Sequence, residues 1–162
     1  MPHSAEVIIA DAGPLIALSR VCDLSLLGGL FEQVWITETV LAECTVRSDK
    51  PEGQIVQAAI ARGDLQLCSD PPGVSGWNLD PGEASAIATA KAIGAGVLMD
   101  DRAGRRVAAS LGIPVIGVLG LLVLAKENGK LRVIRPMLEQ LTASRYFLPS
   151  QLLEDILRKM GE

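Results

Sequence analysis

The chain has 162 residues, of which 49% are hydrophobic and only 3% aromatic, and its formal net charge is -4. This length suits one domain with a full core, and a core of Val, Ile, Leu and Ala is typical of helices packed on a parallel sheet. The acidic balance argues against binding nucleic acid through bulk positive charge, although it is compatible with a local basic patch.

The first half of the chain alternates short strands with helices. Strand-like runs occupy residues 6–10, 33–36 and 65–68. Helical patterns cover residues 15–29, 37–48 and 51–63. The first helical pattern is interrupted near Cys22 and Asp23 and ends at Gly28–Gly29, while Thr37 is the expected cap of the second and Gly63 closes the third. Residues 69–78 (SDPPGVSGWN) predict a loop.

The second half repeats the alternation more clearly. Strand-like runs occupy residues 97–99 and 113–117, and helical patterns cover residues 80–94, 101–112 and 119–130. Two further helical patterns lie in the tail, around MLEQLTASR and PSQLLEDILRKM. Alternating strands and helices with short connections imply an α/β fold with a parallel sheet covered on both faces. We therefore predict a single domain over 1–162, with a core at about 6–130 and a helical tail at 131–162.

Cysteine and histidine are too scarce for several kinds of site. Cys22, Cys44 and Cys68 form no C-x-x-C pair, and their odd number supports neither a disulfide framework nor a zinc site. Reduced thiols predict a cytoplasmic protein. The single histidine, His3, lies next to the start of the chain, which removes Ser-His-Asp and Cys-His catalysis from consideration.

Two apolar runs resemble membrane-related segments, but their composition and length do not fit such segments. The run VIIADAGPLIAL is broken by Asp11 and has no basic leader, so it is a poor secretory signal. The run PVIGVLGLLVLA, which ends at Ala125, has about a dozen residues, whereas a bilayer needs about twenty. We therefore expect no membrane segment.

Acidic residues fall where predicted strands end. Asp11 follows the first strand, and Asp100 and Asp101 follow the strand VLM. Ligands of an open α/β sheet bind beyond these carboxyl ends. Each acid also has a simpler interpretation when it is considered alone. An aspartate after a strand can serve only as a helix N-cap, and Glu83 can serve only to complement a helix dipole. Glu43 can be an ordinary solvated helix residue. A cluster of such carboxylates needs cations, and oxygen ligands without histidine indicate Mg²⁺ or Mn²⁺.

Four separated motifs resemble, in order and spacing, the PIN-domain family and especially its branch related to VapC-type toxins. They are IIADAGPLIAL, VLAEC, PGEASAIATA and GVLMDDRAGRRVAASLGIPVIGVLGLL, and the resemblance runs from about residue 6 to residue 130. The resemblance implies a three-layer α/β/α domain and a Mg²⁺-dependent ribonuclease whose acidic quartet binds one or two metal ions. Transferred position by position, that quartet is Asp11, Glu43, Glu83 and Asp101.

The family register also assigns the neighbours of these acids. Asp101 is the ligand because the family places a hydroxyl residue two positions earlier, where this chain has Met99, and Asp100 is left to cap the following helix or to support the ligands from behind. A hydroxyl residue often follows the first aspartate of the family, and here it is Ala12. The sequence therefore lacks the hydroxyls that accompany the ligands in the family.

Basic residues near the quartet are candidates for contacts with the RNA backbone. They are Arg102, Arg105 and Arg106, with Lys126 and Lys130 on a later helix; an ordinary solvated helix face is the alternative. The resemblance also implies an antitoxin protein as a possible partner. A homodimer through the apolar runs LGLLVLA or LLEDIL is a further expectation, with a core role as the alternative.

Other classes of function fit the sequence less well. A receiver-type phosphoacceptor needs a lysine in the run IPVIGVLG, and a haloacid-dehalogenase-type phosphatase needs an aspartate where the chain has Gly13. The sequence contains no phosphate-binding P-loop and no dinucleotide fingerprint. The remaining alternative is a PIN-like domain with little or no catalysis that binds RNA or a protein partner.

Overall fold

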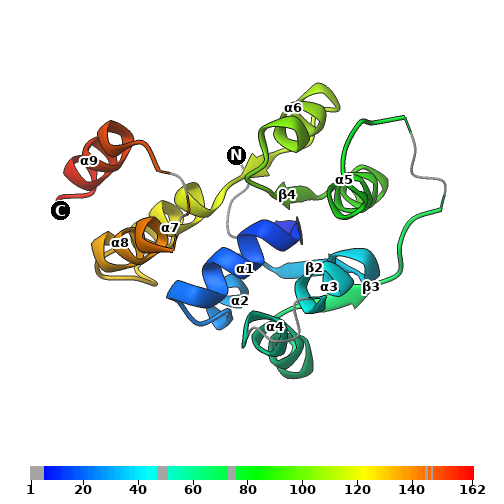
Figure 1. Ribbon diagram of the computed structural model, residues 1–162, viewed down its shortest axis with the longest axis horizontal. Coiled ribbons are helices and arrows are strands. Elements are labelled where there is room, and N and C mark those ends of the chain that lie inside the picture. The colour runs from blue at the N-terminus through cyan, green and yellow to red at the C-terminus, as the bar shows by residue number, and fades with distance from the viewer. Residues whose placement is uncertain (1–5, 47–50, 73–75, 145, 147) are drawn as a thin grey trace.

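The computed structural model describes residues 6–46, 51–72, 76–144, 146 and 148–162 (Figure 1). Within these residues one sheet contains β1 (Val7–Ala10), β2 (Gln33–Thr37), β3 (Gln66–Cys68), β4 (Gly96–Leu98) and β5 (Val115–Ile116). The order across the sheet is β3-β2-β1-β4-β5, and each neighbouring pair is parallel. The predicted α/β class with a central parallel sheet is therefore confirmed. His3 lies outside the described residues.

The helices follow the predicted alternation. They are α1 (Ala12–Val21), α2 (Ser25–Leu30), α3 (Glu38–Thr45), α4 (Pro51–Arg62), α5 (Pro81–Ile93), α6 (Arg102–Ser110), α7 (Val118–Glu127), α8 (Arg135–Ala143) and α9 (Ser150–Lys159). The interruption near Cys22 and Asp23 is confirmed, because it separates α1 from α2. Helix α2 continues beyond the expected stop at Gly28–Gly29, since both Leu27 and Leu30 are buried and hold its last turn against the core.

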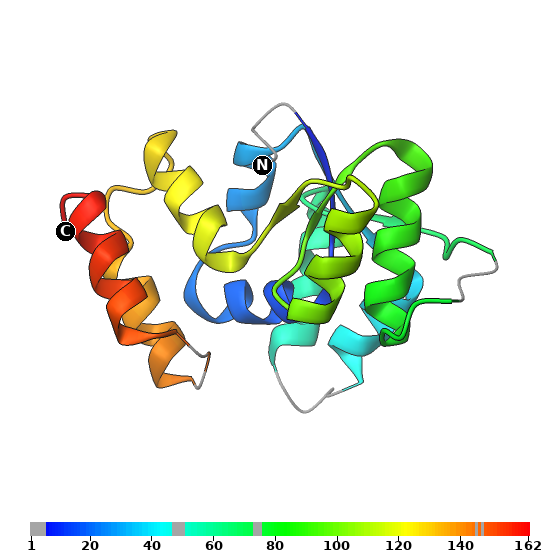
Figure 2. The same cartoon turned by 90° about the horizontal axis from the view of Figure 1, so that it is seen from above.

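Two hydrophobic cores lie on opposite faces of the sheet. Along β1, Ile8 and Ala10 belong to the core beneath α1 and α7, whereas Ile9 belongs to the core beneath α5 and α6. This alternation is the two-residue period of a strand, and it explains why a strand covered on both faces reads as a continuous apolar run. The result is the expected three-layer α/β/α arrangement (Figures 1 and 2).

The C-terminal helices pack on the same core as α7. Helices α8 and α9 lie side by side at the end of the molecule opposite α5 (Figure 2). Leu138, Leu141 and Leu157 of these helices are buried with Leu121 and Leu122 of α7. Leu121, Leu122 and Ala125 of the run LGLLVLA therefore belong to the core, and a dimer through the rest of the run stays a prediction. No helix in the described part of the chain is long and apolar enough to cross a membrane.

Thr37 at the end of β2 is a buried helix cap, as the sequence predicts. Its side chain accepts a hydrogen bond from the backbone N–H of Val40 at 3.1 Å, and its hydroxyl lies 2.8 Å from that of Ser85 on α5. Ser85 donates its own hydroxyl hydrogen to the carbonyl of Gly82 at 2.8 Å, so Thr37 is the donor in the pair. Thr37 thus joins the start of α3 to the start of α5.

We expect Thr37→Val to destabilise the protein by about 2 kcal/mol, because it removes an N-cap and a buried hydrogen bond together. Thr37→Ser keeps both interactions and should cost less than half as much. Urea unfolding of the two variants against the wild type measures the difference. A Val variant as stable as the Ser variant would show that the cap contributes nothing.

Candidate functional site

The carboxyl ends of all five strands meet at one edge of the sheet, and Asp11 lies at its centre. The chain passes from β1 to β2 and β3 on one side and later to β4 and β5 on the other, so the end of β1 is the topological switch point where ligands bind in such sheets. The backbone N–H of Asp11 donates to the carbonyl of Leu98 at 2.9 Å. This bond places Asp11 beside the end of β4, from which Asp100 and Asp101 follow.

Asp11 is a buried carboxylate without a structural partner for one of its oxygens. Only 6% of the residue is exposed, and no described residue donates a hydrogen bond to Oδ1. Although Asp11 occupies the N-cap position of α1, its side chain makes no capping hydrogen bond, which removes the cap as its explanation. Burial, together with the charges of Asp80, Glu43 and Asp100, raises the pKa of Asp11 from 3.8 to about 7, although a backbone hydrogen bond from Ala12 acts in the opposite direction.

Glu43 is held by the first turn of α5 rather than by solvent. Its Oε1 accepts a hydrogen bond from the backbone N–H of Gly82 at 2.9 Å, and a Cβ added at Gly82 would lie 2.6 Å from the same oxygen. Only glycine therefore allows this approach. Burial raises the pKa of Glu43, with a further contribution from the charge of Asp80. The carbonyl oxygen of Gly82 also accepts a hydrogen bond from the Ser85 hydroxyl, so both the N–H and the carbonyl of Gly82 are held in place.

Asp80 joins the cluster and was missed by the sequence reasoning. Its Oδ1 accepts from the backbone N–H of Glu83 at 2.9 Å and caps α5. Glu83 itself is buried, and burial followed by the charges of Asp80 and Asp101 raises its pKa from 4.5 to about 7. The signal available in the sequence was the pair Asp80–Pro81 at a helix start, which indicates a cap but not its proximity to the acids of other strands.

The side chains of the neighbouring residues Asp100 and Asp101 have different surroundings. Asp100 Oδ1 accepts from the backbone N–H of Val118 at 3.0 Å, so it supports the start of α7; the expectation that it caps the following helix, α6, is wrong. Asp101 occupies the N-cap position of α6, but its side chain makes no capping hydrogen bond. It is exposed, and its charge raises the pKa of Glu83. Consecutive residues point to different sides, because each leaves an extended backbone in the opposite direction.

The predicted basic residues divide into two groups. Arg102, Arg105 and Arg106 lie exposed on α6, immediately beyond Asp101. Lys126 donates to Glu162 at 2.6 Å and to the carbonyl of Met160, and Lys130 packs against Gly29 of α2. Lys126 is thus engaged by the C-terminal residues, and the expected contact of the two lysines with RNA stays a prediction.

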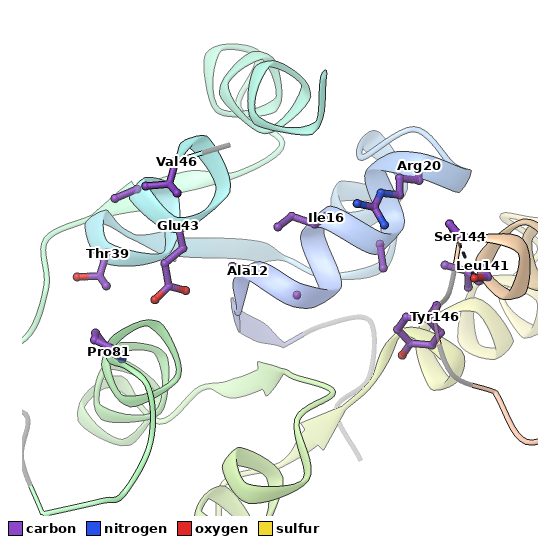
Figure 3. Close-up of a pocket in the computed structure, with 13 residues that line it drawn as sticks. Ala12, Ile16, Arg20, Thr39, Glu43, Val46, Pro81, Leu141, Ser144 and Tyr146 are labelled. Atoms are coloured by element: carbon purple, nitrogen blue, oxygen red, sulfur yellow. Dashed lines mark hydrogen bonds between the residues drawn. The ribbon is translucent and has the colours of Figure 1, made fainter. Parts of the chain in front are cut away.

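A cavity of about 730 Å³ opens beside the acidic residues. Figure 3 shows Ala12 and Ile16 of α1, Glu43 of α3 and Pro81 of α5 around it, with Tyr146 at another side. Glu43 directs its carboxylate into this space (Figure 3). The cavity gives an extended ligand access to the carboxyl edge of the sheet.

The donor set suits a hard divalent cation. All of the clustered side chains are carboxylates, the ligands that Mg²⁺ and Mn²⁺ prefer, and a cation would offset the burial and the mutual repulsion that raise their pKa values. Within the described residues, no three acidic, histidine or cysteine side chains are already close enough to enclose one ion. Two buried carboxylate oxygens at this edge, Oδ1 of Asp11 and Oδ2 of Asp100, have no hydrogen-bond partner among the described residues, and a cation would satisfy them. The hydroxyls of Thr37 and Ser85 hydrogen-bond to each other and join α3 to α5.

Comparisons with known proteins agree with this architecture. The sequence matches a protein-family profile described as a PIN domain over residues 7–162. Among solved structures, the chain is similar to a PilT N-terminus domain protein from the hyperthermophilic archaeon Sulfolobus solfataricus P2, with a TM-score of 0.50 and 20% identity over 71% of this chain and 89% of that one. At this identity the likeness shows the fold alone. No curated protein matches the sequence significantly.

Proposed function

The chain belongs to the PIN-domain family, whose members are typically nucleases, and on that premise we propose that it is a Mg²⁺- or Mn²⁺-dependent endoribonuclease. The observation that carries the proposal is Asp11: a buried carboxylate at the switch point of the sheet, with one unpartnered oxygen and three other acids near it. A purely structural role would leave no buried oxygen without a partner, whereas Oδ1 of Asp11 has none among the described residues and the side chain does not cap α1.

Each acid has a proposed role in hydrolysis. Asp11 and Asp101 would hold the metal directly, and Glu43 and Glu83 would hold it directly or through water. The bound ion supplies a water of lowered pKa and neutralises charge on the phosphate oxygens. Glu43, whose carboxylate accepts a hydrogen bond from the Gly82 N–H, would orient the attacking water. The α6 arginines would contact the RNA backbone.

A cleavage assay with purified protein tests the proposal. The protein is incubated with a 5′-labelled single-stranded RNA in EDTA, in Mg²⁺ and in Mn²⁺, and the products are resolved at nucleotide resolution. We expect internal cleavage in either metal and none in EDTA. Binding without cleavage in both metals would favour the alternative of a catalytically inactive RNA-binding or protein-binding PIN domain. An antitoxin partner and a homodimer remain predictions from the sequence.

Substitutions at Asp100 and Asp101 test which of the two aspartates is the metal ligand. We expect Asp101→Asn to abolish cleavage, because it removes a direct ligand. Asp100→Asn should cost about tenfold or less, since an asparagine oxygen can still accept the Val118 N–H. Single-turnover cleavage in Mg²⁺ measures both. The reverse order would assign Asp100 as the ligand and move the register by one residue.

A further inference from the structure

A second cavity, of about 700 Å³, lies between α6, α7 and α9, and its composition differs from that of the first. Its cationic side chains are Arg102 and Arg105 of α6 and Lys159 of α9. Its apolar side chains include Val115, Leu119, Val123, Leu152 and Ile156. We call this cavity the arginine pocket. Arg106, although on the same helix, does not line it.

The arginine pocket adjoins the acidic residues. Asp100 lines it, and the charge of Asp100 contributes to the raised pKa of Asp11. Tyr146 lines both this pocket and the cavity beside Glu43. Burial and the charge of Asp100 raise the pKa of the Tyr146 hydroxyl, while Arg105 acts in the opposite direction, so the three side chains are neighbours. A chain bound across the acids would therefore enter the arginine pocket next.

The cations of the arginine pocket are available to a ligand. In the described part of the chain, no hydrogen bond or ion pair engages Arg102, Arg105 or Lys159, whereas Lys126 is committed to Glu162. Leu152 of the apolar wall is 43% exposed. Unpaired guanidinium groups beside an apolar surface complement a ligand that carries an anion next to a flat apolar group.

We propose that the arginine pocket binds one nucleotide of single-stranded RNA adjacent to the scissile phosphate. Arg102 and Arg105 would bind its phosphate, and its base would lie against Leu119 and Leu152. A base inside a duplex stays stacked and cannot enter such a pocket, so the pocket selects unpaired RNA. This inference rests on the proposed nuclease function, because the pocket is assigned to the same RNA chain.

Binding and cleavage by the full-length protein test the pocket separately from catalysis. Affinity for a fluorescein-labelled single-stranded decaribonucleotide is measured by anisotropy in EDTA at several salt concentrations, and steady-state cleavage is measured in Mg²⁺. The variants are Arg105→Ala and Leu152→Glu in the pocket. Their matched controls are Arg132→Ala, at an exposed arginine that does not line the pocket, and Val133→Glu, which adds the same charge at a residue 50% exposed outside the pocket.

We expect Arg105→Ala to weaken binding about tenfold and to raise KM with kcat within twofold, since it removes one charge-assisted phosphate contact. The slope of log affinity against log salt should fall by about 0.7 for that lost contact with single-stranded nucleic acid. Leu152→Glu should also weaken binding, and both controls should stay within twofold of the wild type.

The outcomes separate the two proposals. If the wild type cleaves RNA but the pocket variants equal their controls, the nucleotide pocket is wrong and the nuclease stands. If the pocket variants lose RNA affinity but the wild type cleaves nothing in Mg²⁺ or Mn²⁺, the pocket stands as an RNA site and the nuclease is wrong. Unchanged RNA affinity with loss of binding to a protein partner would also overturn the nucleotide pocket.

Discussion

Asp11→Asn is expected to abolish RNA cleavage while making the metal-free protein more stable at pH 7. Loss of a residue that only hydrogen-bonds to a metal ligand lowers activity by up to roughly 100-fold. Because Asp11 is a proposed direct ligand, its loss should lower the activity by more than that. The stability should rise because the pKa of Asp11 is about 7 in the folded chain against 3.8 normally, so ionisation at this buried position opposes folding. A gain on the order of 2 kcal/mol corresponds to a rise in Tm of roughly 5 °C.

The pH dependence of stability gives a second readout of the same carboxylate. Between about pH 4 and pH 7 the folded state holds a proton on Asp11 that the unfolded state has released, so the stability of the metal-free protein falls as pH rises through this window. Glu83, whose pKa is also about 7, contributes in the same direction. Asp11→Asn should remove the part of this pH dependence that comes from Asp11 and leave the part that comes from Glu83.

Thermal unfolding in EDTA at pH 5, 6, 7 and 8 measures this change. Glu154→Gln, which removes one charge from an exposed position on α9, is the control and should follow the wild type. An Asp11→Asn protein that is less stable than the wild type at pH 7 would mean that the Asp11 carboxylate stabilises the fold. Full cleavage activity in that variant would remove Asp11 from the metal site.

Gly82→Ala is expected to reduce cleavage by roughly 10- to 100-fold without unfolding the protein, as loss of a group that orients a metal ligand does. The added methyl would occupy the space of the Glu43 carboxylate, 2.6 Å from its Oε1, and would displace it from the backbone N–H that holds it. The carboxylate is the end of a flexible side chain, so it can move while the backbones of α3 and α5 stay in place.

Gly13→Ala is the matched control for this substitution. Gly13 lies on α1 beside the same cavity, and a Cβ there would meet nothing within 4 Å. The control should therefore keep full activity and gain stability of about 0.5–1 kcal/mol, because alanine is the better helix former. Equal activity of the two variants would show that the Gly82 N–H does not position Glu43. Thermal unfolding confirms that any loss in Gly82→Ala occurs in a folded protein.

Local rules predicted most of the fold. Thr37 was expected to cap a helix because it is the first residue of TETVLAEC, and Gly94, with a φ of 73°, ends α5 where the pattern stops. The strands were found because an apolar run of four or five residues followed by a turn or a helix start is short for a helix and suits a buried strand. Each of these signals lies within a few residues of the element that it defines.

The parts of the site that escaped prediction depend on distant partners. Asp100 was expected either to cap the helix that follows it or to support the ligands from behind; its Oδ1 accepts from Val118, 18 residues later, because β5 lies beside β4, so it does not cap α6. Lys126 was assigned to RNA, yet it pairs with Glu162, 36 residues away. In the sequence, Asp80 and Gly82 indicate only the start of a helix. They come close to Glu43 only when α3 and α5 pack together, which the sequence does not show. Nothing in the sequence singled out Tyr146.

The position of a bound Mn²⁺ ion tests the central claim most directly. Crystals of the full chain grown with Mn²⁺ are measured at a wavelength where manganese scatters anomalously. We predict an anomalous peak at the carboxyl edge of the sheet, bonded to Asp11 Oδ1 and to oxygens from Glu43, Glu83 and Asp101. A fully occupied peak elsewhere, or none at saturating Mn²⁺, would contradict a metal-dependent nuclease site at this edge.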